Sequence, residues 1–233
     1  MVYLQAAKES AKQRGIYQVP YQGGTMKELH SEEGSNSAQF SSTFDYYVLT
    51  HSAATVPPTF EVFSTADNKL VRTIEDNQGL KTKLQGFNMG DFSFFDYTNE
   101  TGTLLHGWMI KPKDFDPSKQ YPVLMYVYGG PGAQTVRDAW GGQNYMWFQM
   151  LAQNGYIVVS VDYRGTDARG QAFRKSTYRN LGGLETQDQI EVAQYLAKQS
   201  YIDGQRIGIF GWSFGGYLST SALAKGADVF KLA

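Results

Sequence analysis

The strongest structural signal in this 233-residue sequence is the segment Arg206-Ile-Gly-Ile-Phe-Gly-Trp-Ser-Phe-Gly-Gly-Tyr217. Its apolar beginning, Arg206 to Phe210, predicts a buried strand, and the residues from Gly215 onward predict a helix. Between them stands a G-x-S-x-G motif centred on Ser213. Such a strand–turn–helix holds its serine in a strained backbone conformation with the hydroxyl exposed, and the turn leaves no room for side chains at the two glycines. We therefore predict a nucleophile at Ser213; the alternative is a structural turn with a capping serine.

Upstream of this motif, apolar strands alternate with amphipathic helices. This rhythm predicts an α/β fold with a parallel sheet covered on both faces. Ligands of such sheets bind at the carboxyl ends of the strands. The predicted strands are Leu104 to Ile110, Pro122 to Tyr128 and Tyr156 to Val161, and the predicted helices are Tyr145 to Asn154 and Glu185 to Gln199.

Two further motifs stand at the ends of these strands. Tyr126-Val-Tyr-Gly-Gly-Pro-Gly132 leaves the second strand as a glycine-rich loop, which in α/β-hydrolases supplies part of the oxyanion hole. A plain strand-to-helix turn is the alternative. Asp162-Tyr-Arg-Gly-Thr-Asp-Ala-Arg-Gly170 leaves the third strand, and here we expect Arg164 to form a structural ion pair rather than to act in catalysis.

Residues 1–88 have a different pattern, that of short strands separated by turns. Aromatic residues make up 15% of the sequence, and much of this content lies in the first half, which suits a sheet-rich region. Four or so strands at even spacing match one β-propeller blade and the edge of its neighbour. A small sandwich fragment is the alternative. The predicted strands are 15–20, 37–41, 46–50, 58–63 and 70–74.

Composition excludes several classes of function. The formal net charge of −1 gives no electrostatic basis for capturing nucleic acid or anionic lipid. The absence of cysteine excludes disulfides, a thiol nucleophile and cysteine-ligated zinc. The three histidines lack ligand spacing, so we expect neither a metal nor an organic cofactor. No segment is long and apolar enough to span a bilayer. The first residues lack the apolar core of a signal peptide, and we expect the chain to begin inside a longer protein.

The motifs together resemble the prolyl oligopeptidase family of serine peptidases. Gly211-Trp-Ser-Phe-Gly-Gly-Tyr217 is similar to its nucleophile segment, and Tyr128-Gly-Gly-Pro131 and Asp162-Tyr-Arg-Gly-Thr166 fall where the family has its oxyanion loop and its D-x-R-G segment. The resemblance extends to the dipeptidyl peptidase IV branch. It rests there on residues 60–64, 71–77 and 111–115, which look like the end of a propeller and the return into a hydrolase domain.

This resemblance implies a fold and a set of roles. Residues 1–88 would end a β-propeller, and residues 89–233 would form the N-terminal part of an α/β-hydrolase sheet. Ser213 would be acylated, and the hydroxyl of Tyr128 and the backbone N–H of Phe214 would hold the oxyanion. Trp212 and Phe214 would shape the pocket for a small residue such as proline. Such enzymes release Xaa-Pro or Xaa-Ala dipeptides from free N-termini of peptides, often as homodimers outside the cytoplasm, in the periplasm or after secretion.

The sequence departs from the family pattern after the nucleophile. The triad order in α/β-hydrolases is Ser, Asp, His, yet the residues after Ser213 contain one acid, Asp228, and no histidine. Asp228 follows too soon to be the triad acid, and nothing places His106 beside Ser213. We expect His30 and His51 to be ordinary surface residues. The chain is thus expected to be truncated after the nucleophile helix and inactive by itself, with one apolar side of the Ser213 strand left exposed.

Four functions are compatible with these residues. A dipeptidyl peptidase comes first, and an acylaminoacyl peptidase or an esterase on the same catalytic half comes second. A non-catalytic binding module is the third, although it has no need of a strained serine. A lipase is the fourth and is disfavoured because no amphipathic lid is evident.

Overall fold

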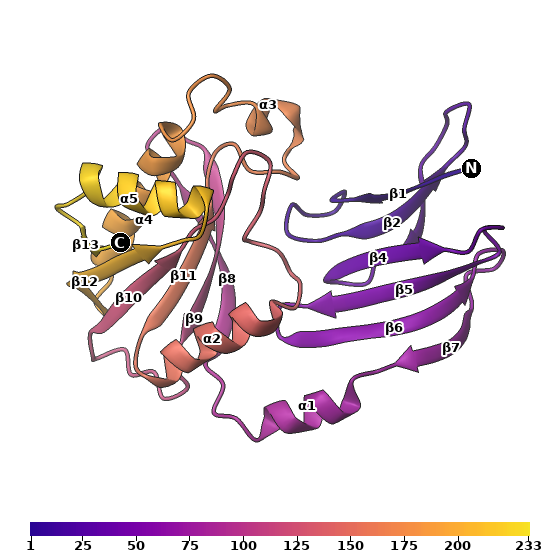
Figure 1. Ribbon diagram of the computed structural model, residues 1–233, viewed down its shortest axis with the longest axis horizontal. Coiled ribbons are helices and arrows are strands. Elements are labelled where there is room, and N and C mark those ends of the chain that lie inside the picture. Colours follow the sequence, from indigo (N-terminus) through magenta and orange to yellow (C-terminus); the bar gives the residue numbers. More distant parts are fainter. The chain divides into compact units, whose positions relative to one another are not determined.

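The computed structural model describes residues 1–233, which form two compact units (Figure 1). Unit 1 comprises Met1–Phe87 and the short segment Arg137–Gly142, and unit 2 comprises Asn88–Val136 and Gln143–Ala233. The short segment groups with unit 1 through Asp138. Its N–H donates to the carbonyl of Lys12, and its buried carboxylate accepts from the N–H of Ala54 at 2.8 Å.

Unit 1 consists of two antiparallel sheets. The first has three strands in the order β1-β2-β3, and the second has four strands in sequence order. A helix, α1 (Gln78–Gln85), follows the last strand. β7 is exposed along its whole length, as befits an edge strand. The strands are β1 (Val2–Ala6), β2 (Gly15–Val19), β3 (Lys27–His30), β4 (Ser35–Phe40), β5 (Tyr46–Ala53), β6 (Val56–Ser64) and β7 (Leu70–Glu75).

The core of unit 1 is small and aromatic. Tyr47 is buried, its ring stacks on that of Phe63, and its hydroxyl donates to the amide oxygen of Asn68. Burial raises the pKa of Tyr47 to about 12, so the hydroxyl stays a donor. Every second residue in the first part of β5 is buried, as the period of two requires, and these residues meet buried side chains of β2 and β3. The buried members are Ile16, Leu29, Tyr47 and Leu49.

The expectation that His30 and His51 are ordinary surface residues is wrong for His51. Only 8% of His51 is exposed, and its Nδ1 lies 2.9 Å from the amide oxygen of Asn36. Asn36 is fully buried, and its amide group also donates to two main-chain carbonyls. His30 is half-buried, and burial lowers its pKa. A buried asparagine needs partners for its polar atoms, which explains why a histidine lies inside.

Unit 2 contains a six-stranded mixed sheet in the order β13-β12-β10-β11-β9-β8. β13, β12, β10 and β11 are parallel, whereas β9 and β8 form an antiparallel hairpin at one side. The prediction of a parallel sheet is therefore wrong for the strand expected at Leu104 to Ile110, because a hairpin has no crossover helix; its partner β8 was not predicted. The strands are β8 (Asp91–Thr98), β9 (Leu104–Lys111), β10 (Tyr121–Tyr126), β11 (Ile157–Asp162), β12 (Ile202–Phe210) and β13 (Phe230–Leu232).

Helices cover both faces of this sheet (Figure 1). From β10 the chain passes through α2 (Gly142–Gln153) to β11 on one side, then through α3 (Gly170–Arg174) and α4 (Leu184–Ala197) to β12 on the other side. Because crossovers are right-handed, this reversal puts α2 and α4 on opposite faces. α5 (Phe214–Lys225) packs beside α4. The carboxyl end of β10 therefore lies at the topological switch point, where such sheets bind ligands.

The two faces differ in their packing. Val123 and Met125 of β10 point toward α4 and α5, in a core that includes Leu196 and Leu218. Tyr126 points the other way, and its ring lies 5.2 Å from that of Phe148 on α2. None of the six residues of β11 is exposed, as expected for a central strand.

The Ser213 strand does not stand at the edge of the sheet, contrary to the expectation from its sequence. β13 pairs with β12 in parallel, with Ile207 opposite Phe230. This strand has only three residues, and a run that short carries no periodicity from which it could be predicted. None of the helices is long and apolar enough to cross a membrane.

Candidate active site

Ser213 stands at the turn between β12 and α5 in a conformation that side chains rarely adopt. Its φ is 57° and its ψ is −118°, and the residue is exposed. Backbone strain of this kind costs on the order of 1–3 kcal/mol and persists only where the surroundings enforce it. Here two main-chain hydrogen bonds close the turn, from Gly215 N–H to Trp212 O at 2.8 Å and from Tyr217 N–H to Ser213 O at 3.1 Å.

The two glycines of the motif are required by the neighbouring strand. A Cβ added to Gly211 would lie 2.0 Å from the carbonyl oxygen of Val127, and one added to Gly215 would lie 2.2 Å from the same oxygen. Val127 directly follows β10 and donates its N–H to Phe210 O at 2.9 Å. The turn is thus pressed against the end of β10, which explains why glycine stands at both positions. Gly216 is different, because a Cβ there would meet nothing closer than 3.5 Å.

This close approach places Tyr128 beside the turn. A Cβ on Gly215 would lie 3.0 Å from Tyr128 Cα, and the side chain of Tyr128 is 36% exposed. The N–H of Phe214 is the first of α5, so it has no acceptor within the helix and is free to bind an oxyanion. The structure therefore brings Ser213, Tyr128 and the Phe214 N–H to one place at the carboxyl edge of the sheet.

Tyr163 binds the main chain of the loop after Tyr128, a role that was not predicted from the sequence. The Tyr163 hydroxyl donates a hydrogen bond to Gly129 O and lies 3.4 Å from Tyr128 O. Tyr163 is 1% exposed, and burial raises the pKa of its hydroxyl far above the ordinary value, so it remains protonated. Gly129 has a φ of 42°, and the Tyr163 hydroxyl fills the space where a Cβ would stand.

Asp162 holds the next part of the same loop. One carboxylate oxygen accepts from the N–H groups of Thr135 and Val136 at 2.8 and 3.2 Å, and the other accepts from the Gln134 amide at 3.1 Å. Asp162 is buried, and burial raises the pKa of its carboxyl while these donors oppose the rise. These hydrogen bonds join the loop after β10 to a side chain at the end of the neighbouring strand β11, and such contacts leave no pattern in the sequence.

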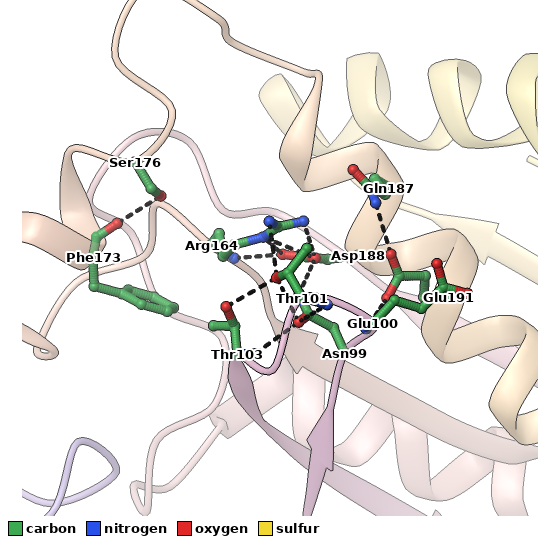
Figure 2. A network of polar contacts seen from close by, with 10 residues as sticks. All are labelled: Asn99, Glu100, Thr101, Thr103, Arg164, Phe173, Ser176, Gln187, Asp188 and Glu191. Atoms are coloured by element: carbon green, nitrogen blue, oxygen red, sulfur yellow. Dashed lines mark hydrogen bonds and ion pairs between the residues drawn. The ribbon is translucent and has the colours of Figure 1, made fainter.

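Arg164 forms the structural ion pair that its sequence context predicted. Its guanidinium binds the carboxylate of Asp188 on α4, with Nη2 2.7 Å from Oδ1, and its main-chain N–H binds the other oxygen at 2.9 Å. Arg164 is 9% exposed and Asp188 is fully buried. Figure 2 shows that the amide group of Asn99 donates to the same carboxylate, and that the main-chain N–H of Glu100 donates to the carboxylate of Glu191. Consecutive residues 162–164 thus connect the loop after β10 and α4 to the end of β11.

The two residues expected to shape the substrate pocket have different surroundings. The indole of Trp212 is 83% exposed beside Ser213. The ring of Phe214 is half-buried; it packs against the hydrophobic core, with its centroid 5.4 Å from that of Tyr217. Trp212 thus offers an exposed apolar surface next to Ser213, whereas Phe214 mainly anchors the start of α5.

Neither His106 nor Asp228 approaches Ser213. β10 and β11 lie between the strand of His106 and β12, and three steps of about 4.8 Å put His106 roughly 14 Å away. His106 instead contacts Asp96 on β8, with Nδ1 2.6 Å from Oδ1. Asp228 follows α5, whose 12 residues extend about 18 Å from the serine. The base that Ser213 requires is therefore neither of them.

Comparison with known proteins agrees with this arrangement. The profile of the prolyl oligopeptidase family matches residues 144–233, and that of the dipeptidyl peptidase IV N-terminal region matches residues 1–58. The crystal structure of Porphyromonas gingivalis dipeptidyl peptidase 4 superposes with a TM-score of 0.93 and 40% identity, over 99% of this chain and 32% of that one. Dipeptidyl peptidase 4 of Trichophyton equinum is 36% identical and that of Trichophyton rubrum 35% identical, each over 99% of this chain and 30% of the relative.

These matches, together with the serine turn at the switch point, show that the chain belongs to the prolyl oligopeptidase family. Within that family it belongs to the dipeptidyl peptidase IV branch. The resemblance seen in the sequence is confirmed for both. The chain spans about a third of the length of the relatives that it matches.

Proposed function

We propose that this protein is a serine peptidase that releases N-terminal dipeptides, with proline or alanine second, through an acyl-enzyme at Ser213. The observation that carries the proposal is the backbone of Ser213, held at a φ of 57° between a buried strand and the first turn of α5. A structural turn has no need of such strain, whereas a nucleophile gains an exposed hydroxyl at a helix N-terminus. The relatives named dipeptidyl peptidase 4 support the substrate class.

The proposed chemistry uses the residues that the fold brings together at the turn after β12. Ser213 Oγ attacks the carbonyl carbon of the second residue while a base takes its proton, and the oxyanion is held by the Tyr128 hydroxyl and the Phe214 N–H. The leaving amine takes the proton and departs, and water then hydrolyses the dipeptidyl ester. Trp212 and Phe214 contribute to the pocket for proline or alanine.

The proposal includes the parts of the architecture from which the site is built. Residues 89–233 are taken as the beginning of an α/β-hydrolase domain, and residues 1–88 as the end of a β-propeller. The strand order around β10 and the antiparallel four-stranded sheet β4–β7 support these assignments. We propose further that the base and its acid partner lie outside residues 1–233, so that these residues alone are inactive, and that the complete protein is a homodimer.

Hydrolysis of matched substrates tests this function. The protein, expressed from its complete coding sequence, is given Gly-Pro p-nitroanilide and the same compound acetylated at its N-terminus. We expect release from the free substrate only, and at least a 10³-fold loss in Ser213→Ala. Ser200→Ala, at an exposed serine before β12, is the control and keeps full activity. Preference for the acetylated substrate would instead favour an acylaminoacyl peptidase, and no release of either would favour a binding module.

A further inference from the structure

A cavity of about 610 Å³ lies in unit 2 between the loop after β10 and the connection from α3 to α4. Its volume is in the range of small-ligand sites. Pro131 lines one side, and the remaining wall comes from the connection. The cationic side chains in this wall are those of Arg174, Lys175 and Arg179, and the apolar surface comes from Tyr178 and Leu181.

The cavity borders the candidate active site on two sides. The guanidinium of Arg174 lies over Gly132 of the oxyanion loop, where an added Cβ would be 3.0 Å from its Nε. At the other side, Gly182 adjoins the lining residue Leu181 and faces Tyr217, whose hydroxyl would lie 2.1 Å from a Cβ on Gly182. Tyr217 is bound through its N–H to the carbonyl of Ser213. A peptide held at Ser213 therefore has this cavity within its reach.

The charges in the cavity are not balanced. Arg174 has one carboxylate nearby, that of Asp167 at 3.9 Å, and both side chains are half-exposed or more, so this pair is weak. Lys175 and Arg179 form no ion pair in the structure, and the guanidinium of Arg179 lies 5.4 Å from the centroid of the Tyr178 ring. Three cations against one carboxylate leave a positive cavity suited to an anion, and guanidinium groups match the geometry of carboxylates.

We propose that this cavity binds a carboxylate of the substrate on the leaving-group side of the scissile bond. The inference rests on the proposed function. In a substrate of that kind the acyl side is a dipeptide that begins with an ammonium group and ends in an uncharged proline or alanine. Unless the first residue is itself acidic, a carboxylate that reaches the cavity comes from the residues that leave, either from an acidic side chain or from the C-terminus of a short peptide.

The experiment compares kcat/KM for three tetrapeptides with the protein expressed from its complete coding sequence. They are Gly-Pro-Gln-Gln amide, Gly-Pro-Glu-Glu amide and Gly-Pro-Gln-Gln with a free carboxylate. We expect one or both anionic peptides to exceed the neutral amide by about two- to fivefold for each cation engaged, as for exposed charge pairs, and the ratio to fall in 0.5 M NaCl. The two anionic arms separate the side chain from the C-terminus as the source.

Matched variants assign the effect to the cavity. The double variant Lys175→Gln/Arg179→Gln should bring the ratio close to one and leave Gly-Pro p-nitroanilide, which lacks a leaving peptide, unaffected. Asp167→Asn should raise the ratio, because it removes the one competing carboxylate. Lys225→Gln, at the far end of α5, is the control and changes nothing.

Several results would overturn the proposal. The first is an equal kcat/KM for all three peptides. The second is a ratio of anionic to neutral peptide that is unchanged in the double variant. The third is a preference for negative charge only at the first residue, measured by comparing Glu-Pro with Gln-Pro p-nitroanilide. Failure of the proposed function has a different signature, since Gly-Pro p-nitroanilide would then not be cleaved. In that case the binding of a labelled Glu-Glu dipeptide, measured by fluorescence anisotropy, tests whether the cavity binds carboxylates. Binding that does not weaken in the double variant would contradict the assignment to the cavity.

Discussion

The hydroxyl of Tyr163 donates a hydrogen bond to the main-chain carbonyl of Gly129, and this contact fixes the loop that carries Tyr128. The two residues are 34 positions apart and follow neighbouring parallel strands, β11 and β10. The tyrosine needs no charge and touches no reacting atom in the proposed reaction. It acts as a positioning residue, because the direction of the Tyr128 side chain depends on the main chain that Tyr163 holds.

Removing this hydroxyl should reduce kcat while leaving substrate binding nearly intact. In Tyr163→Phe the ring still fills its site, but the Gly129 carbonyl loses its partner, which costs about 1 kcal/mol. If that cost falls on the oxyanion hole, kcat decreases about fivefold to tenfold and KM changes little. Steady-state kinetics with Gly-Pro p-nitroanilide measure both. Tyr156→Phe, at a partly exposed tyrosine before β11, is the control, and a kcat equal to wild type in Tyr163→Phe would contradict the positioning role.

Adjacent glycines on α5 should respond in opposite ways to alanine. Gly215→Ala drives a Cβ to 2.2 Å from Val127 O, so we expect a loss of at least about 2 kcal/mol of stability together with loss of activity. Gly216→Ala has room for its methyl group and removes a glycine from a helix, so stability should rise by up to about 1 kcal/mol. Urea unfolding of the two variants measures the difference, and equal midpoints would show that the turn is not pressed against β10.

The ion pair between Arg164 and Asp188 should contribute strongly to the stability of unit 2. Asp188→Asn leaves a buried guanidinium without its counter-charge, and such losses cost about 3–5 kcal/mol. Asp203→Asn is the matched control, because Asp203 is bound to Arg206 at 2.6 Å but on the surface, where little change is expected. Denaturant unfolding compares them. Similar midpoints for both variants would contradict a structural role for the buried pair.

Glu185 at the start of α4 should make stability fall as the pH rises. Burial, and to a smaller degree the charge of Asp188, raise the pKa of this carboxyl above its ordinary value of 4.5. The folded protein therefore holds a proton that the unfolded chain has released, so this contribution decreases from about pH 4.5 upward until the folded pKa is passed. Glu185→Gln should flatten the plot of Tm against pH in that window. Parallel plots for variant and wild type would show that Glu185 ionises normally.

Much of the fold was predictable because its strongest signals are local. Long apolar strands such as β10 and β11, and helices with one apolar face such as α4, appear at the predicted places. The strand–turn–helix around Ser213 was predictable for the same reason, since its apolar strand, its G-x-S-x-G motif and the start of its helix are consecutive in the sequence. The role of Arg164 followed from its place after a strand end.

What could not be predicted depends on contacts between distant residues. The antiparallel direction of β9 is set by its pairing with β8 and β11, and β13 is too short to show a period. Tyr163 looked like one residue of a loop motif, and only the fold brings its hydroxyl to Gly129. His51 is buried because Asn36 needs a partner, a requirement that no spacing along the chain reveals.

Covalent labelling shows whether Ser213 is the nucleophile. The protein expressed from its complete coding sequence is treated with a diphenyl phosphonate ester of a Gly-Pro analogue and digested, and the adduct is located by mass spectrometry. We expect one adduct, on the peptide that contains Ser213, formed more slowly in Tyr163→Phe and absent in Ser213→Ala. An unmodified Ser213, or an adduct on another serine in a protein that cleaves Gly-Pro p-nitroanilide, would contradict it.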